Sequence, residues 1–262
     1  MREKISACVI TGNEEIKIRR CLESLTWCDE IVVVDSFSQD RTVEICREFT
    51  DRVYQHEWLG YIGQRNLVRE MARFDWVLHV DADEVVSPEL REEIGREFSM
   101  YVQNCDGYQF PRLVHYLGKW IRHGEWYPDM KLRLFRKDAG WSEGEEPHDQ
   151  VVVKGRVKTL KNPLWHFTYD DINDHLETMN RFSGIAAEAK YRDGYRFRWW
   201  DFFFRPPWRF FKSYILKLGL LDGRQGFIVA LMSSFGVFVK YAKLMELWIQ
   251  HQKPKPASPA HD

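Results

Sequence analysis

The sequence predicts an α/β protein with a mostly parallel central sheet flanked by helices. Short apolar runs alternate with amphipathic stretches through residues 1–80, which is the pattern of strand–helix–strand units. Apolar residues make up 44% and charged residues 29% of the chain, and this composition excludes a disordered chain, a collagen and a polytopic membrane protein. The length of 262 residues fits one large domain, or one domain with an appended element.

The elements follow from these runs in chain order. Residues 6–11 form the first predicted strand, apolar residues at helical spacing predict a helix over 15–25, and residues 31–34 are a β-branched run of the kind buried on both faces of a sheet. The remaining predicted elements are a helix over 40–49, a strand near Val53, a helix over 62–72, a strand over 76–80, a helix from Pro88 with Ser87 as its N-cap, and strands over 107–112 and 131–135.

The composition changes beyond about residue 190. Residues 190–262 hold 13 Lys and Arg against 5 Asp and Glu, and residues 191–214 contain 12 aromatic residues interleaved with basic ones. Such a segment suits a membrane surface, where Trp and Tyr favour the headgroup level, more than single-stranded nucleic acid. Packing on the sheet domain or a dimer interface remains an alternative. The apolar run over 226–239 is 14 residues long, short of the roughly 20 that span a bilayer.

The cysteines and the N-terminus indicate a compartment. Five cysteines without a CxxC pair predict reduced core thiols, and the first apolar run is too short for a signal peptide. We therefore expect a cytoplasmic protein, peripherally associated with the inner face of the cytoplasmic membrane.

Acidic residues follow two of the predicted strands. Asp35 ends the run over 31–34, and Asp81, Asp83 and Glu84 follow the strand over 76–80. Ligands of open α/β sheets bind at the carboxyl ends of strands. If the backbone stays extended, Asp81 and Asp83 point the same way and both reach one divalent cation with the diphosphate that it carries. Helix capping or simple solvation is the alternative for these acids.

Four segments together resemble a family 2 glycosyltransferase. They are the segment over 9–15 (VITGNEE), the segment over 32–42 (VVVDSFSQDRT), the pair Arg65-Asn66 and the triplet Asp81-Ala82-Asp83. The segments over 124–129 and 205–208 resemble the bacterial branch that adds β-1,4-glucose to the lipooligosaccharide core. The resemblance implies a GT-A fold, which is a Rossmann-like sheet that binds a UDP-sugar.

The resemblance also implies the donor site. The residues expected at the nucleotide sugar are Thr11, Asn13, Glu14, Asp35, Arg65, Asp81 and Ala82. Asp35 would bond the uracil or ribose, and Arg65 would lie near the diphosphate. Asp81 and Asp83 would hold a divalent metal, Mg or Mn, with His166 as a third ligand; in an aromatic run His166 is otherwise a core histidine. Gly12 and Ser36 depart from the aromatic and the second aspartate that many relatives carry there.

An inverting transfer needs a base for the acceptor hydroxyl. The resemblance places it at Asp149, while Glu143, Glu146 and Asp129 are nearby acids that could take the role. The residues expected at the acceptor are Asp129, His148 and Trp126.

The predicted function is transfer of a hexose, glucose from UDP-glucose, to a lipid-anchored oligosaccharide such as the lipopolysaccharide core. The alternatives are transfer to a polyprenyl-phosphate-linked sugar for capsule or exopolysaccharide, and a catalytically silent membrane-bound interaction protein. The expected partners are the UDP-sugar, the lipid-anchored acceptor and the membrane surface, without nucleic acid. The expected domains are a catalytic domain over 1–185, with its nucleotide half over 1–100 and its acceptor half over 101–185, a helical membrane-associating region over 186–252 and a disordered tail over 253–262.

Overall fold

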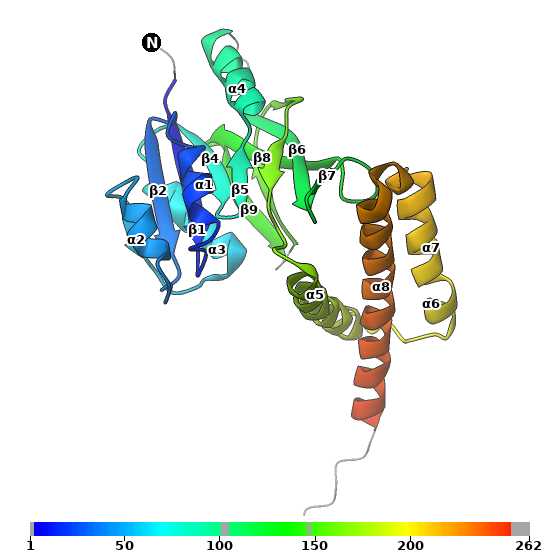
Figure 1. Ribbon diagram of the computed structural model, residues 1–262. Helices are drawn as coiled ribbons and strands as arrows, with labels where there is room; N and C mark the ends of the chain where they lie inside the picture. Colours follow the sequence, from blue (N-terminus) through cyan, green and yellow to red (C-terminus); the bar gives the residue numbers. More distant parts are fainter. Residues whose placement is uncertain (1–2, 101–104, 146–147, 253–262) are drawn as a thin grey trace, which may run out of the picture. The chain divides into compact units, whose positions relative to one another are not determined.

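The computed structural model describes residues 3–100, 105–145 and 148–252, with the side chains of residues 145, 148, 149 and 252 outside the described set. The chain forms two compact units (Figure 1). The sheet unit comprises Met1–His115 and Tyr127–Thr168, and the helical unit comprises Tyr116–Trp126 and Tyr169–Asp262.

The sheet unit carries a mixed, mostly parallel sheet in the order β3-β2-β1-β4-β8-β6-β12-β5. Its strands are β1 (Ile5–Thr11), β2 (Glu30–Asp35), β3 (Val53–Gln55), β4 (Trp76–Asp81), β5 (Glu84–Val86), β6 (Gly107–Tyr116), β8 (Asp129–Arg136), β11 (Val157–Thr159) and β12 (Leu164–His166), and β9 (Gly140–Glu145) forms a hairpin with β10 (His148–Val153). Strands β3, β2, β1 and β4 run parallel, and β8 runs antiparallel between β4 and β6. The predicted α/β class is confirmed.

Helices cover both faces of the sheet because the buried strands present apolar side chains on both faces. Val33 packs in the cluster that includes α1 (Ile18–Glu23), α2 (Thr42–Arg47) and α4 (Pro88–Met100), whereas its neighbour Val32 packs on the opposite face with α3 (Gly60–Met71). Each fully buried Val or Leu stabilises the fold by roughly 1.5–3 kcal/mol. The run over 31–34 is therefore buried on both faces, as its composition predicts.

Helix boundaries follow local capping. Ser87 Oγ accepts from the N–H of Leu90 at 3.1 Å and caps α4, as predicted. The first two helices are shorter than the predicted ranges over 15–25 and 40–49. Asp40 lies outside α2 because its carboxylate accepts from Thr42 N at 2.9 Å, which makes it a turn residue.

The helical unit contains β7 (Lys119–Ile121), α5 (Ile172–Arg192), α6 (Trp200–Phe203), α7 (Arg205–Phe211), η2 (Lys212–Leu216), η3 (Gly219–Asp222) and α8 (Gly223–Gln252). The expectation that this stretch is too short to span a bilayer is wrong, because the helix does not end with the apolar run: α8 continues past Lys240 and is 30 residues long. Residues 240–246 are mostly strong helix formers, so the charge interrupts the apolar run without ending the helix. The stretch Gly219–His251 is long and apolar enough to cross a membrane, by length and composition.

Candidate active site

The loops that follow β1 and β2 are bonded to each other at the carboxyl edge of the sheet. Asn13 donates its N–H to Ser38 Oγ and accepts from Gln39 N through Oδ1, both at 2.8 Å. Its φ of 56° lies in the left-handed region, which Asn tolerates better than most residues. Glu14 N donates to Thr42 Oγ1 at 2.8 Å. Thr11, at the end of β1, is buried. The loop after β1, which is predicted to bind the nucleotide, is therefore held in place by its bonds to the segment after β2.

Asp35 holds the second loop from inside. The carboxylate is fully buried, and it accepts from Ser38 N at 2.9 Å, from Ser38 Oγ and from Gln55 Nε2 at 3.1 Å. The bond from Asp35 to uracil or ribose stays a prediction. In this structure the carboxylate fixes the conformation of the loop through Ser38 and Gln55.

The backbone turns immediately after Asp81. β4 ends there, and Ala82 and Asp83 form a tight turn before β5. The premise that the strand stays extended through Asp83 is therefore wrong, and the two carboxylates have different partners. Ala82 is buried within this turn.

Two arginines bind Asp81. Arg65, from α3, approaches both carboxylate oxygens at 2.8 Å, and Arg133, from β8, approaches Oδ2 at 2.6 Å. Burial alone would raise the pKa of Asp81, but the cations Arg133 and Arg65 lower it far below its usual value. Arg65, which is expected near the diphosphate, lies beside the Asp81-Ala82-Asp83 triplet, and Arg133 is a second cation there.

A chain of alternating charges extends from Arg133 across the sheet. Arg133 also donates to Glu84 Oε1 at 3.0 Å, and Arg112 Nη1 lies 3.2 Å from the same oxygen. Arg112 also donates to Asp129 Oδ2 at 2.7 Å, and Lys131 pairs with Asp129 Oδ1 at 3.1 Å. Because Glu84 is fully buried, these cations are needed to compensate its charge.

Arg112 and Arg133 are site residues that the sequence motifs do not predict. A signal was present, because each arginine stands inside an otherwise apolar strand segment, Arg112 before Leu113-Val114 and Arg133 between Leu132 and Leu134. A charge at such a position needs a buried partner. The acids that follow the predicted strand over 76–80, which are Asp81, Asp83 and Glu84, are the candidate partners.

Asp83 and His166 form a separate pair beside this network. His166, at the end of β12, donates from Nε2 to Asp83 Oδ2 at 3.0 Å. Burial raises the pKa of Asp83, but the neighbouring His166 imidazole lowers it below its ordinary value. The pairing of β12 with β5 places His166 opposite Glu84, and Phe167 N donates to Asp83 O at 2.9 Å, so backbone bonds fix the pair.

The pair fits two ligands of one divalent metal. An oxygen and a nitrogen separated by 3.0 Å match two adjacent ligands of an octahedral ion with bonds of about 2.1 Å. Carboxylate oxygen suits Mn²⁺ and Mg²⁺, and a neutral imidazole nitrogen is a common metal ligand once its proton has left. Asp81 is less available, since two arginines already bind it. Among the described residues no group of three His, Cys, Asp or Glu side chains gathers around one point.

The other predicted residues lie in several places. Asp149 and His148 lie in β10, opposite Gly144 and Glu145, and their side chains are outside the described set, as is the whole of Glu146. Glu143 is exposed and accepts from Trp141 Nε1 at 2.7 Å. Trp126 belongs to the helical unit, where its ring packs 5.3 Å from that of Tyr116.

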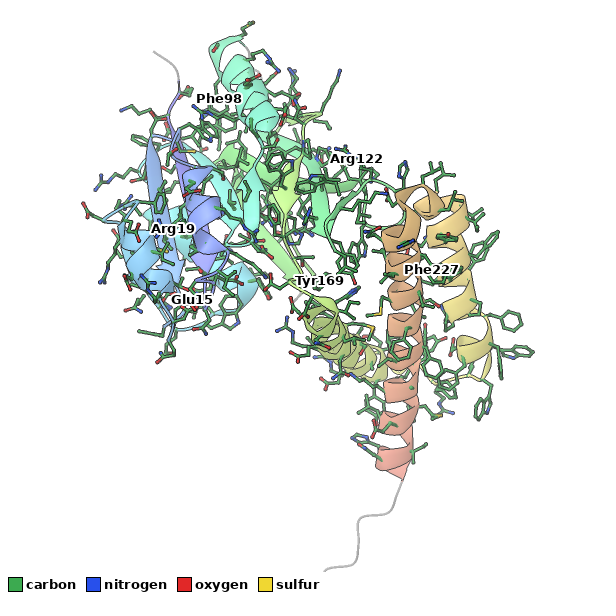
Figure 2. The ribbon with its side chains drawn as sticks, viewed as in Figure 1. Glu15, Arg19, Phe98, Arg122, Tyr169 and Phe227 are labelled. Carbon is green, nitrogen blue, oxygen red and sulfur yellow. The ribbon has the colours of Figure 1, made fainter. Side chains whose placement is uncertain are left out.

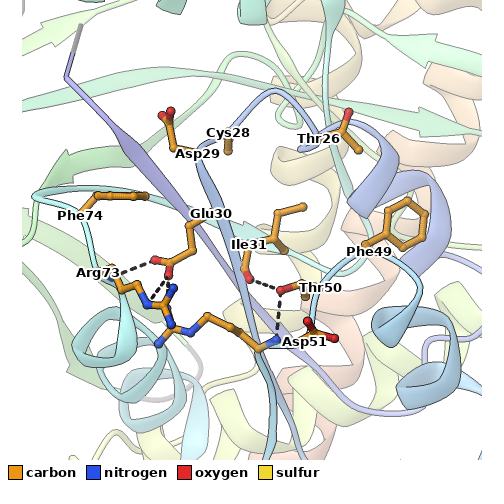
Figure 3. A pocket seen from close by; sticks show the side chains of 11 residues that line it. Thr26, Cys28, Asp29, Glu30, Ile31, Phe49, Thr50, Asp51, Arg73 and Phe74 are labelled. Carbon is orange, nitrogen blue, oxygen red and sulfur yellow. Dashed lines mark hydrogen bonds and ion pairs between the residues drawn. The ribbon is translucent and has the colours of Figure 1, made fainter. Parts of the chain in front are cut away.

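A surface hollow at the opposite end of β2 has different chemistry (Figure 3). Glu30, the first residue of β2, is paired there with Arg52 and with Arg73, whose N–H donates to it at 2.8 Å. Glu30 and Asp35 are five strand residues apart, about 16 Å. The hollow is therefore distinct from the carboxyl edge where Asp35, Asp81 and Asp83 stand.

Comparison with known proteins gives a family match. The model of the family described as "Glycosyl transferase family 2" matches residues 6–140. An uncharacterised glycosyltransferase of Rickettsia typhi is 30% identical over 94% of this chain and 88% of its own length. The lipopolysaccharide core biosynthesis glycosyltransferase LpsC of Rhizobium meliloti is 28% identical over 92% of each chain. Among solved structures, S. aureus TarS 1-349 in complex with UDP-GlcNAc aligns with a TM-score of 0.49 at 16% identity, covering 96% of this chain and 93% of that chain.

Proposed function

Because the chain belongs to glycosyl transferase family 2, we propose that it transfers glucose, with inversion, from UDP-glucose to a hydroxyl of a lipid-anchored oligosaccharide. One observation carries this proposal furthest: the Asp81-Ala82-Asp83 turn stands at the carboxyl edge of the sheet with Arg65, Arg133 and His166 around it. Cations, a carboxylate and an imidazole in one place are the groups that bind a metal diphosphate.

The donor diphosphate is bound by the arginines and by the Asp83–His166 pair. A guanidinium matches two phosphate oxygens at once, so Arg65 and Arg133 can shift part of their bonding from Asp81 to the diphosphate. Asp83 and His166 would hold a divalent metal, with Asp81 nearby. When bound, that metal stabilises the negative charge of the departing diphosphate. The loops over 12–15 and 36–42 orient the uridine.

Asp149 takes the proton from the acceptor. As its carboxylate removes the hydroxyl proton, the oxygen attacks the anomeric carbon, and the bond from that carbon to the diphosphate oxygen breaks, with its electron pair leaving on UDP. Asp129 is a weaker candidate for this role, because Arg112 and Lys131 outweigh burial and lower the pKa of its carboxyl. Glu143 keeps an exposed carboxylate and is the alternative base.

The acceptor is proposed from the relatives and from the composition of the helical unit. LpsC is named for lipopolysaccharide core biosynthesis, and it aligns along nearly the whole chain. An acceptor of that kind is held at a membrane, and the aromatic and basic residues over 190–217 suit the inner face of the cytoplasmic membrane. A polyprenyl-phosphate-linked sugar is the second candidate, because it would occupy the same surface.

Transfer of label tests the proposal. Purified protein with Mn²⁺ or Mg²⁺ and UDP-[¹⁴C]glucose is incubated with core lipopolysaccharide or with a polyprenyl-phosphate-linked saccharide extract. Label in the core fraction, lost in Asp149→Asn and kept in Glu143→Gln, supports the proposed acceptor and base. Label in the polyprenyl fraction moves the acceptor to the second candidate. No transfer to either acceptor, with an intact cellular role in Asp83→Asn, favours a catalytically silent protein.

A further inference from the structure

An apolar stripe runs along the outside of the segment from α6 to η2. Trp200, Phe204, Trp208, Phe211 and Ile215 are 68%, 60%, 57%, 44% and 41% exposed. Their spacing of four, four, three and four residues keeps them on one side of a helical segment. Figure 2 shows ring-bearing side chains projecting from α6 and α7 away from α8. A row of large exposed apolar side chains on one side of a helical segment, unlike single scattered ones, marks an interaction surface.

The opposite side of the same segment is fixed within the helical unit. Asp201, nearly fully buried, accepts from Tyr195 OH at 3.0 Å and from Arg198 N at 3.0 Å. Ser234 Oγ, on α8, donates to the carbonyl of Pro206 at 2.8 Å. The exposed side chains are therefore held outward by the structure around them, and the stripe is a preformed surface.

The charges around the stripe are positive. The segment over 196–217 carries the basic residues Arg196, Arg198, Arg205, Arg209, Lys212 and Lys217, and its one acid, Asp201, is buried. Arg209 and Lys212 pair with Glu125 and Arg205 pairs with Asp201, whereas Lys217 is exposed. Exposed tryptophans flanked by basic side chains match the headgroup level of an anionic bilayer.

The second half of helix α8 packs against α5. Lys243 Nζ donates to Asn180 Oδ1 at 2.7 Å and to Ser183 Oγ at 3.0 Å, and both acceptors lie on α5. Tyr241 and Leu244 are buried in that packing. Crossing the bilayer as a separate helix would take these polar bonds into hydrocarbon or break them.

We propose that the helical unit is a monotopic anchor: the stripe from Trp200 to Ile215 is immersed in one leaflet of an anionic phospholipid bilayer, and α8 does not cross it. This anchor specifies how the proposed enzyme binds the membrane, and its role near a lipid-anchored acceptor rests on the proposed function. The apolar first half of α8 then supports the anchor by packing against α7, as the contacts of Phe227 with Phe210 and of Ser234 with Pro206 show.

Vesicle binding tests the surface. The full chain is sedimented with phosphatidylcholine vesicles and with vesicles containing 30% phosphatidylglycerol, without donor or acceptor. Binding is expected only to the anionic vesicles, with at least a tenfold loss of partitioning in Trp200→Ser/Trp208→Ser. The matched control is Trp58→Ser, an exposed tryptophan of the sheet unit that is expected to leave binding unchanged. Equal binding of the double variant and the wild type overturns the assigned surface.

Topology tests the monotopic arrangement on the wild-type sequence, which removes any concern about variant folding. Epitope tags at the two ends are exposed to protease in inside-out membrane vesicles. Digestion of both tags from the cytoplasmic side is expected, and protection of the C-terminal tag overturns the proposal in favour of a spanning α8. Vesicle binding without transfer would contradict the proposed function alone, and transfer to detergent-solubilised acceptor without vesicle binding would contradict the anchor alone.

Discussion

Replacing Arg133 with methionine removes the cation that joins the partly buried Asp81 to the fully buried Glu84. Arg133 is 6% exposed, and its Nη2 approaches Asp81 at 2.6 Å and Glu84 at 3.0 Å. Breaking a buried pair by removing one partner typically costs 3–5 kcal/mol. Arg65 still binds Asp81 and Arg112 still binds Glu84, so we expect the low end, about 3 kcal/mol, out of a typical total of 5–15 kcal/mol.

Urea unfolding measures this loss, with the transition of the sheet unit identified by amide exchange in β1 and β4. The control is Arg73→Met, whose side chain is 70% exposed and whose removal is expected to cost under about 1 kcal/mol. Combining Arg133→Met with Glu84→Gln should cost less than the sum of the two single changes by at least about 1 kcal/mol, because the stranded carboxylate is then neutral.

Acidification gives a second check of the same network. Arg133 and Arg65 hold the folded pKa of Asp81 below its ordinary value of 3.8, so the stability that its ionised carboxylate contributes is present above pH 3.8 and is lost as the pH falls below it. The difference in free energy of unfolding between the wild type and Arg133→Met should therefore become smaller below about pH 4. The reasoning would be refuted if Arg133→Met lowered the free energy of unfolding by less than about 1 kcal/mol at pH 7 and if its effect simply added to that of Glu84→Gln.

Three further changes test other buried groups. Asp35→Asn places a side-chain amide against the donors Ser38 N and Gln55 Nε2, so urea unfolding should show a free energy of unfolding lower by about 1–3 kcal/mol. Calorimetry should show weaker UDP binding, and unchanged values of both would contradict the role of Asp35 in the loop. Burial lowers the pKa of His175 to about 4, so wild-type stability should fall by about 3 kcal/mol between pH 6.5 and 4, a slope absent from His175→Asn. His79→Phe should leave urea stability unchanged or higher, because both ring nitrogens are buried without a partner among the described residues; a loss above about 3 kcal/mol would show a missed bond.

Apolar pattern alone was sufficient to predict the core of the sheet. The run over 31–34 predicts a strand buried on both faces, and its alternate residues do pack on opposite faces. Acids at strand ends predict the edge where Asp35, Asp81 and Asp83 stand. These features depend on local sequence, because strand period and the position of a strand end are local properties.

The partners of those acids could not be predicted in the same way. Arg133 reaches Asp81 from a strand 52 positions away, and only the antiparallel insertion of β8 beside β4 brings them together. The turn at Ala82 likewise separates the roles of Asp81 and Asp83, although their spacing suits one extended strand. Pairing between distant strands and a turn set by tertiary contacts leave no periodic signal in the chain.

The central claim is that Asp83 and His166 bind a divalent metal together with a uridine diphosphate. The most direct measurement is the thermal shift of the purified protein with UDP, GDP and CMP, each with and without Mn²⁺, for the wild type, Asp83→Asn and the surface control Glu89→Gln. A ligand at about 100 times its dissociation constant stabilises by roughly 2.7 kcal/mol. We predict that only the combination of UDP and Mn²⁺ raises the melting temperature. This shift should be retained in Glu89→Gln and lost in Asp83→Asn. A shift that Asp83→Asn retains in full, or no shift with any nucleotide, would contradict the claim.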